Sequence, residues 1–226
     1  MQTKPSSPND SSLTQSPDRE PSISLCLYHL FKWSVVSPVL HVYFQGRIYG
    51  AEHVPRRGRL LVVSNHASDF DPPIVSNCVG RPVAFMAKEE LFKVPILKQA
   101  IAAYGAYPVK RGAADRAAMK AAIASIEQGW ATGVFLDGTR TTDGRIHDPK
   151  LGAAWIAAKT QAPMLPVSLW GSEQIFQPGS GFPRPVPLTI RIGQPIPPPQ
   201  SSDRAELEAV TQRCAAAIHA LHDLGR

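Results

Sequence analysis

The residues best suited to chemistry are a histidine and an aspartate five positions apart, His66 and Asp71. An imidazole can accept a proton near neutral pH, and a neighbouring carboxylate can fix its tautomer. Five steps along a helix would place the two side chains on different faces, but across a turn they could meet. The spacing therefore predicts a base held by a carboxylate. The simpler alternative is that Asp71 only caps a helix and His66 is a polar turn residue.

The residues around this pair predict a strand, a turn and a helix. The apolar run 60–63 (LLVV) has the length and composition of a buried strand. Pro72 and Pro73 suit the first turn of a helix, where a missing N–H costs nothing. His66 would then lie just beyond the carboxyl end of a strand, where α/β proteins commonly place their functional groups.

Two further polar clusters also follow expected strands. They consist of Lys110 and Arg111, after a strand at 106–109, and of Asp137, Gly138, Thr139 and Arg140, after a strand at 132–136. Parallel neighbouring strands would bring these clusters to the same edge as the histidine. A base, cations and a Gly-Thr turn with free N–H groups suit a phosphate beside a reactive hydroxyl. Taken alone, the clusters could be a solvated surface pair and an ordinary tight turn.

Apolar runs and helical periods alternate along the rest of the chain. Further strands are expected at 82–87, 163–169 and 188–192, and helices at 73–78, 113–128, 151–160 and 204–224. This alternation predicts an α/β fold with a mostly parallel central sheet flanked by helices.

The N-terminal region has a different character from the core. Residues 1–21 are rich in Ser and Pro, and we expect a disordered tail. Residues 22–46 are long and apolar enough to interact with a bilayer, but they contain Lys32 and Pro38. We predict one or two membrane-interfacial helices bent at Pro38. A packed helical hairpin and a full membrane span are the alternatives.

Composition limits the classes of function. The 226 residues carry a net charge of +6 with a pI near 9.4, so anionic partners are plausible. Scattered basic residues without an aromatic platform argue against nucleic acid. Three widely spaced cysteines give neither metal-ligand spacing nor a disulfide framework. Neither a phosphate-binding P-loop nor a G-x-S-x-G nucleophile motif occurs, so the histidine is expected to activate a hydroxyl of the substrate.

These motifs resemble those of the 1-acyl-sn-glycerol-3-phosphate acyltransferases, from about residue 48 to residue 196. Four blocks carry the resemblance, in order: 65–72 (NHASDFDP), 105–112 (GAYPVKRG), 135–141 (FLDGTRT) and 162–167 (APMLPV). The first matches the family's Asn-His-x-Ser-x-x-Asp block. The third is usually Phe-Pro-Glu-Gly-Thr-Arg-Ser, so Leu136, Asp137 and Thr141 depart from the family pattern.

The resemblance implies an acyltransferase domain at 47–226. It would move a fatty acyl group from acyl-CoA or acyl carrier protein to the sn-2 hydroxyl of lysophosphatidic acid, giving phosphatidic acid. His66 and Asp71 would be catalytic. The acceptor phosphate would be bound by Lys110, Arg111, Asp137, Gly138, Thr139 and Arg140.

The same resemblance implies no metal and no bound cofactor. The expected partners are a lysophospholipid acceptor, the thioester donor and a membrane surface, with no nucleic acid. The expected location is the cytoplasmic face of a membrane, as a peripheral or monotopic protein. Alternatives are an acyltransferase or transacylase for another lysolipid, a lipid hydrolase, and a module that binds anionic lipid without catalysis.

Overall fold

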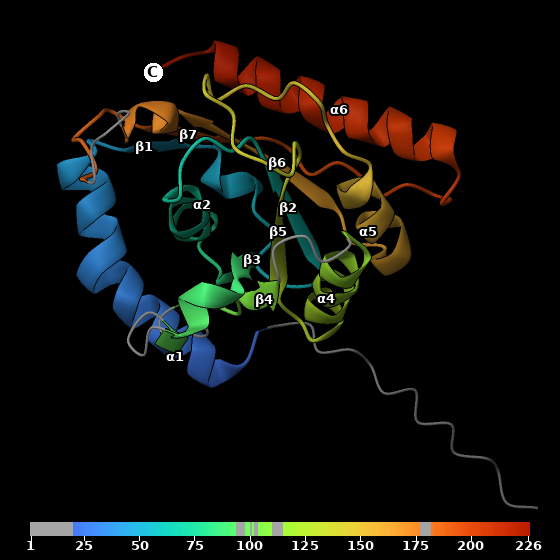
Figure 1. Cartoon of the computed structure of the whole chain (residues 1–226), viewed down its shortest axis with the longest axis horizontal. Coiled ribbons are helices and arrows are strands. Elements are labelled where there is room, and N and C mark those ends of the chain that lie inside the picture. The colour runs from blue at the N-terminus through green and yellow to red at the C-terminus, as the bar shows by residue number, and fades with distance from the viewer. Residues whose placement is uncertain (1–19, 94–97, 100, 102–103, 110–114, 177–181) are drawn as a thin grey trace, which may run out of the picture.

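The fold is built around one twisted sheet (Figure 1). The computed structural model describes residues 20–93, 98–99, 101, 104–109, 115–176 and 182–226. Within them, seven strands form the sheet in the order β1-β7-β6-β2-β5-β3-β4. The strands are β1 (Arg47–Tyr49), β2 (Leu60–Ser64), β3 (Val83–Lys88), β4 (Tyr107–Val109), β5 (Ala131–Phe135), β6 (Met164–Trp170) and β7 (Thr189–Ile192).

The strand pairing confirms the predicted α/β class. Strand β2 is central and pairs in parallel with β5 and β6, and β3 pairs in parallel with β5 and β4. Only the β6–β7 pair among the named strand pairs is antiparallel. Strand β1 was not predicted, because its three residues lie in a turn-rich stretch too short to show a period.

Helices cover both faces of the sheet because the strands are apolar on both sides. The helices are α2 (Asp71–Val79), α4 (Asp115–Glu127), α5 (Gly152–Thr160) and α6 (Arg204–Asp223). Leu60 and Val62 of β2 pack in a core with residues of α2, whereas Leu61 and Val63 pack with residues of α4, α5 and α6 (Figure 1). The fully buried β2 therefore fixes the position of the turn that follows it.

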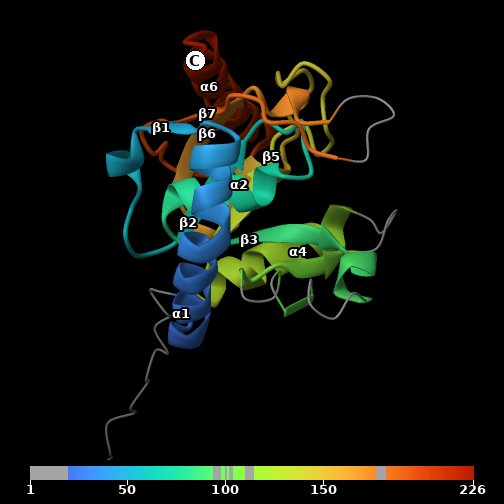
Figure 2. The same cartoon turned by 90° about the vertical axis from the view of Figure 1, so that its left-hand side faces the viewer.

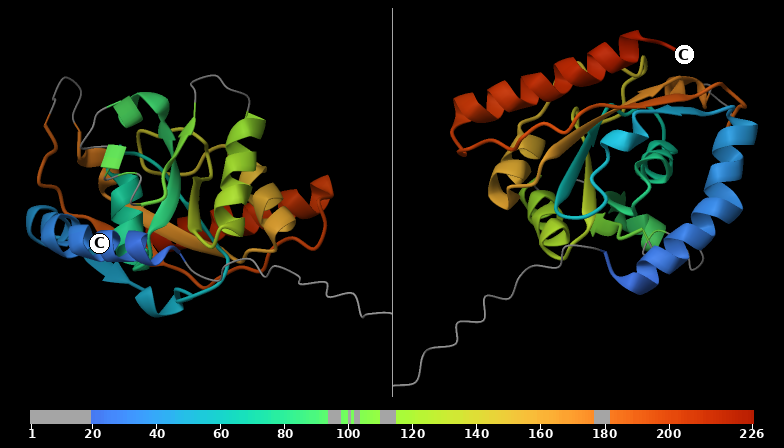
Figure 3. Two further views of the ribbon diagram at one scale, coloured as in Figure 1. Left: turned by 90° about the horizontal axis from the view of Figure 1, so that it is seen from below. Right: turned by 180° about the vertical axis from the view of Figure 1, so that it is seen from behind.

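The N-terminal segment is one continuous helix and not a hairpin (Figures 2 and 3). It consists of α1 (Ser22–Phe31) followed by π-helical stretches at Lys32–Val36 and Val39–Tyr43. Pro38 lies between the two stretches and keeps helical angles, φ −58° and ψ −44°. By length and composition alone, Ser22–Tyr43 could cross a membrane. The segment runs along the outside of the molecule, on the side away from α6 (Figure 3).

This helix has one face on the protein and one on solvent. Tyr28, Leu40 and Phe44 are buried against the core. Apolar side chains also point outward, namely Ile23, Leu27, Leu30, Phe31, Trp33, Val35, Val39, Val42 and Tyr43. These side chains form an exposed apolar surface, and large apolar patches typically mark sites of interaction.

Lys32 faces the protein and not the apolar surface. Its ammonium donates a hydrogen bond to the Asn77 carbonyl at 2.9 Å, and the Tyr28 hydroxyl donates to the Ser76 carbonyl at 2.8 Å. Both carbonyls belong to the last turn of α2, where helical acceptors lack intrahelical partners. Partial burial lowers the pKa of Lys32. The positive charge therefore caps α2 and joins the N-terminal helix to it.

Replacing Lys32 with methionine should lower the free energy of unfolding by about 1–2 kcal/mol. Methionine keeps the buried stem but leaves the Asn77 carbonyl without its charged donor. Urea denaturation measures the change, with the exposed Lys120→Met on α4 as the control. Equal stability of the two variants would show that the cap contributes nothing.

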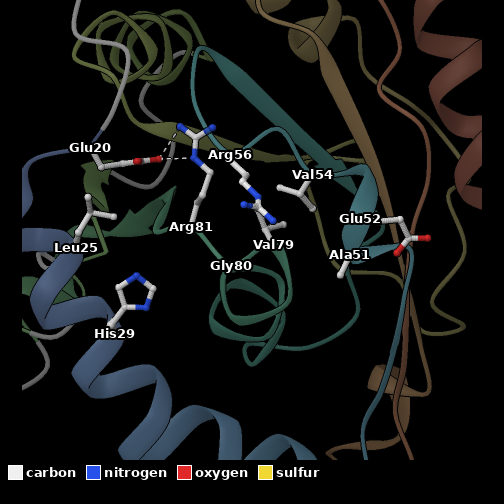
Figure 4. A pocket seen from close by; sticks show the side chains of 10 residues that line it. All are labelled: Glu20, Leu25, His29, Ala51, Glu52, Val54, Arg56, Val79, Gly80 and Arg81. Atoms are coloured by element: carbon white, nitrogen blue, oxygen red, sulfur yellow. Dashed lines mark hydrogen bonds and ion pairs between the residues drawn. The ribbon is translucent and has the colours of Figure 1, made fainter.

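Glu20 lies within the stretch predicted as a disordered tail, but in the structure its side chain is buried. Glu20 and Arg81 are both buried, and the Glu20 carboxylate lies 2.7 Å from the guanidinium (Figure 4). Arg81 also donates to the carbonyls of Pro55 and Gly58. The pair lines a cavity of about 450 Å³ that contains none of the predicted site residues. Burial of the pair fixes the start of the N-terminal helix against the sheet.

Candidate active site

The structure brings His66 and Asp71 together as the spacing predicts. Nδ1 of His66 lies 2.8 Å from Oδ2 of Asp71. A carboxylate oxygen only accepts, so Nδ1 carries the proton and Nε2 is the basic nitrogen. Within the described part of the chain, no group is hydrogen-bonded to Nε2. The ring is 16% exposed, which leaves it open to a substrate.

Asp71 is held by the turn that it closes. Its Oδ2 also accepts the backbone N–H groups of Ala67 at 2.7 Å and Ser68 at 2.8 Å. The residue is fully buried and opens α2, whose N-terminus favours a negative charge. These contacts stabilise the carboxylate and fix the imidazole that it orients.

An aromatic stack holds the other side of the histidine. The rings of His66 and Phe135 are nearly parallel, at 9°, with centroids 3.8 Å apart. Phe85 stacks behind Phe135 at 5.1 Å. The stack therefore fixes the plane of the imidazole from the side opposite to its open face.

Leu136 and Asp137, which depart from the family pattern at the end of β5, hold the loop that follows. Leu136 N–H donates to the Ser64 carbonyl at 3.0 Å, a bond that a proline at this position could not make. The Asp137 carboxylate accepts the N–H groups of His147 at 3.2 Å and Asp148 at 2.9 Å. Asp137 thus contacts backbone amides of the loop that follows β5. Its part in phosphate binding stays a prediction.

The turn after Asp137 brings the predicted phosphate-binding residues beside the histidine. Thr141 N–H donates to the His66 carbonyl at 2.8 Å, so residues 138–141 lie against the turn that carries His66. Gly138 has a φ of +67° with open space around its Cα, and it and Thr139 are exposed. Nη1 of Arg140 lies 2.5 Å from Oδ2 of Asp69.

Lys110 and Arg111 lie outside the described residues. Strand β4, which precedes them, is three strands away from β2 in the sheet, or ~14 Å at the usual strand spacing. Their proposed contact with the acceptor phosphate therefore stays a prediction.

Asn65 is a site residue that sequence reasoning missed. Its Nδ2 donates to the carbonyls of Gly144 at 2.6 Å and Leu169 at 2.8 Å, and its Oδ1 accepts the Leu169 N–H at 2.9 Å. One buried amide thus ties the end of β2 to the end of β6 and to the loop after β5. The position of Asn65 directly before His66 was the only hint in the sequence that it belongs to the site. Its hydrogen-bond partners could not be predicted, because they are up to 104 residues away.

Comparison with known proteins identifies the class to which this site belongs. The acyltransferase family profile matches residues 45–170, which include the His66 turn and the loop after β5. The chain belongs to the acyltransferase family.

Several curated proteins are similar to the chain in sequence. The chain is 31% identical over 151 residues to a chloroplastic 1-acyl-sn-glycerol-3-phosphate acyltransferase of Brassica napus, covering 66% of this chain and 43% of that protein. It is 26% identical over 182 residues to the enzyme of that name from Bacillus subtilis, covering 78% and 84%. The chain spans about half the length of the first curated relatives that it matches.

A solved structure shares the fold. It is the 1-acyl-sn-glycerophosphate acyltransferase PlsC from Thermotoga maritima, with a TM-score of 0.73 and 28% identity, covering 88% of this chain and 79% of that one. The chain is thus similar in sequence and in fold to 1-acyl-sn-glycerol-3-phosphate acyltransferases.

Proposed function

We propose that the protein transfers a fatty acyl group from acyl-CoA or acyl carrier protein to the sn-2 hydroxyl of lysophosphatidic acid, forming phosphatidic acid. The observation that carries this proposal is the 2.8 Å bond between His66 Nδ1 and a buried Asp71 carboxylate, with an arginine on the adjoining loop. The names of the similar proteins supply the acceptor class. The thioester is a co-substrate, and the proposed reaction uses no bound cofactor or metal.

In this mechanism Nε2 of His66 removes the proton of the acceptor hydroxyl as the oxygen attacks the thioester carbonyl. The tetrahedral intermediate collapses, the new ester forms and the carbon–sulfur bond breaks. The imidazolium then returns its proton to the leaving thiolate. Asp71 keeps the ring in the required tautomer and stabilises its positive charge.

The acceptor phosphate would lie on Arg140 and on the backbone N–H groups of Gly138 and Thr139. A guanidinium suits phosphate because its N–H groups can bind two oxygens at once. Lys110 and Arg111 would add positive charge. The lipid tails of acceptor and donor would enter from the membrane, which the exposed apolar face of the N-terminal helix would contact.

The proposal also includes a division into domains and a location. We propose that residues 22–46 attach the protein to a membrane and that residues 47–226 form the catalytic domain, with the active site at the cytoplasmic face. A peripheral or monotopic attachment suits the inward-facing Lys32, because a charge bonded to α2 is shielded from lipid.

Product analysis tests the function. The purified protein is incubated with lysophosphatidic acid and either acyl-CoA or acyl carrier protein thioester, and products are identified by mass. Phosphatidic acid should form with at least one donor. Steady release of free fatty acid when the acceptor is omitted would instead support a lipid hydrolase. Faster acylation of another lysolipid than of lysophosphatidic acid would show that the other lysolipid is the acceptor.

Arg140→Ala should raise the KM for lysophosphatidic acid by about tenfold and leave kcat within a few-fold, because it removes a charge-assisted bond to a group that does not react. The KM for the thioester should stay unchanged. Steady-state kinetics with both substrates varied measures these constants. An unaltered acceptor KM would show that Arg140 does not bind the acceptor.

A further inference from the structure

The guanidinium proposed to bind phosphate already has an acidic partner from the same chain. Oδ2 of Asp69 lies 2.5 Å from Nη1 of Arg140. Asp69 follows His66 by three residues and precedes Asp71 by two, so it belongs to the catalytic turn. The proposed proton transfer uses no group of Asp69, which makes its place beside the cation a separate feature of the site.

The backbone around both partners is held in place. Asp71 accepts the N–H groups of Ala67 and Ser68, and the Ser68 hydroxyl accepts the Phe70 N–H at 3.2 Å. On the other side, the Thr141 N–H and hydroxyl both donate to the His66 carbonyl. Asp69 and Arg140 are thus carried on two loops that are fixed to each other, and the turn geometry directs one toward the other.

The pair remains accessible to a ligand. The side chain of Arg140 is 46% exposed and that of Asp69 is 64% exposed. A phosphate arriving from solvent can therefore reach the guanidinium, but the carboxylate already neutralises its charge. The phosphate must displace Asp69 or bind beside a negative charge, and like charges a few ångströms apart repel.

We propose that Asp69 is a specificity-determining residue that competes with the acceptor phosphate for Arg140. It weakens the binding of phosphate-bearing acceptors and leaves the binding of phosphate-free acceptors unaffected. The affinity advantage of phosphate-bearing over phosphate-free acceptors is therefore smaller than it would be without Asp69. This inference rests on the proposed function of the site. The opposite role, in which Asp69 orients Arg140 for the phosphate, predicts effects of the opposite sign.

The test measures binding without turnover. Calorimetry gives the Kd of a short-chain lysophosphatidic acid, and of the monoacylglycerol with the same chain, for the parent and for Asp69→Asn, with no thioester present. Exposed ion pairs contribute little, so the Kd of the phosphate ligand should fall by about two- to fivefold. The Kd of monoacylglycerol should not change.

A matched control separates competition from net charge. Glu208→Gln removes the acid of another exposed pair, in which Arg204 Nε lies 2.7 Å from the Glu208 carboxylate on α6, and it changes the net charge equally. This variant should bind both ligands like the parent. In an Arg140→Ala background, Asp69→Asn should no longer improve phosphate binding.

Three results would overturn the inference: a Kd for the phosphate ligand that is unchanged or higher in Asp69→Asn, an equal gain in Glu208→Gln, or a gain that persists without Arg140. Because no acyl transfer is measured, a failure here is distinct from a failure of the proposed function. The latter appears as absence of phosphatidic acid in the product analysis of the parent.

Discussion

Replacing His66 with alanine is expected to lower kcat for acyl transfer by about 10³-fold or more, with the acceptor KM changed little. In the proposed mechanism Nε2 of His66 is the base that removes the hydroxyl proton, and general-base catalysis contributes about 10²–10⁴-fold. The residue is partly exposed and its loss leaves Asp71 with two backbone donors. The initial rate of thiol release, with lysophosphatidic acid saturating, measures the effect.

The control for this variant is an exposed histidine with a carboxylate partner. Nε2 of His147 lies 2.9 Å from Oδ1 of Asp143, but this pair is in the loop after β5 and has no assigned role. His147→Ala should keep kcat within a few-fold of the parent. A rate for His66→Ala within a few-fold of the parent, in protein with an unchanged circular dichroism spectrum, would contradict the assignment of the base.

Replacing Asp71 with asparagine is expected to lower kcat by about 10²–10⁴-fold. An amide oxygen can still accept from the N–H groups of Ala67 and Ser68, so the turn should persist. The same oxygen still faces Nδ1 of His66, but the neutral amide lacks the charge that would stabilise the imidazolium formed on proton transfer. Stopped assays that quantify phosphatidic acid by mass measure the loss.

Stability distinguishes a catalytic effect of Asp71→Asn from an unfolded protein. Thermal unfolding of the variant should shift by only a few degrees, since its hydrogen bonds to the backbone remain possible. A folded Asp71→Asn protein with nearly full activity would show that the carboxylate is a helix-terminal residue without a part in the reaction, which is the simpler alternative to a catalytic pair.

The fold could be predicted because its central strands are apolar on both sides and end at polar turns. The run at 60–63 gave β2 within one residue, and Pro72 and Pro73 marked the first turn of α2. Local patterns of this kind depend on neighbouring residues alone. Strand β1 was missed because three residues in a turn-rich stretch show no period, and its place in the sheet comes from pairing with β7, 142 residues away, Arg47 with Thr189.

The site was only partly predictable for the same physical reason. The His66–Asp71 bond spans five residues and follows from a turn. The contacts of Asn65 and Arg140 join loops from different strands, and no spacing in the sequence encodes them. The partner of Lys32 could not be predicted for the same reason. In the sequence Lys32 is a lone charge in an apolar run and argues against a membrane span, but its bond to the Asn77 carbonyl joins residues 45 positions apart.

The most direct test of the account is a crystal structure of the protein with lysophosphatidic acid bound and no thioester donor. We expect the free hydroxyl oxygen within about 2.6–3.2 Å of His66 Nε2, with the phosphate on Arg140. A lipid hydroxyl pointing away from the imidazole, with its phosphate bound elsewhere, would contradict it.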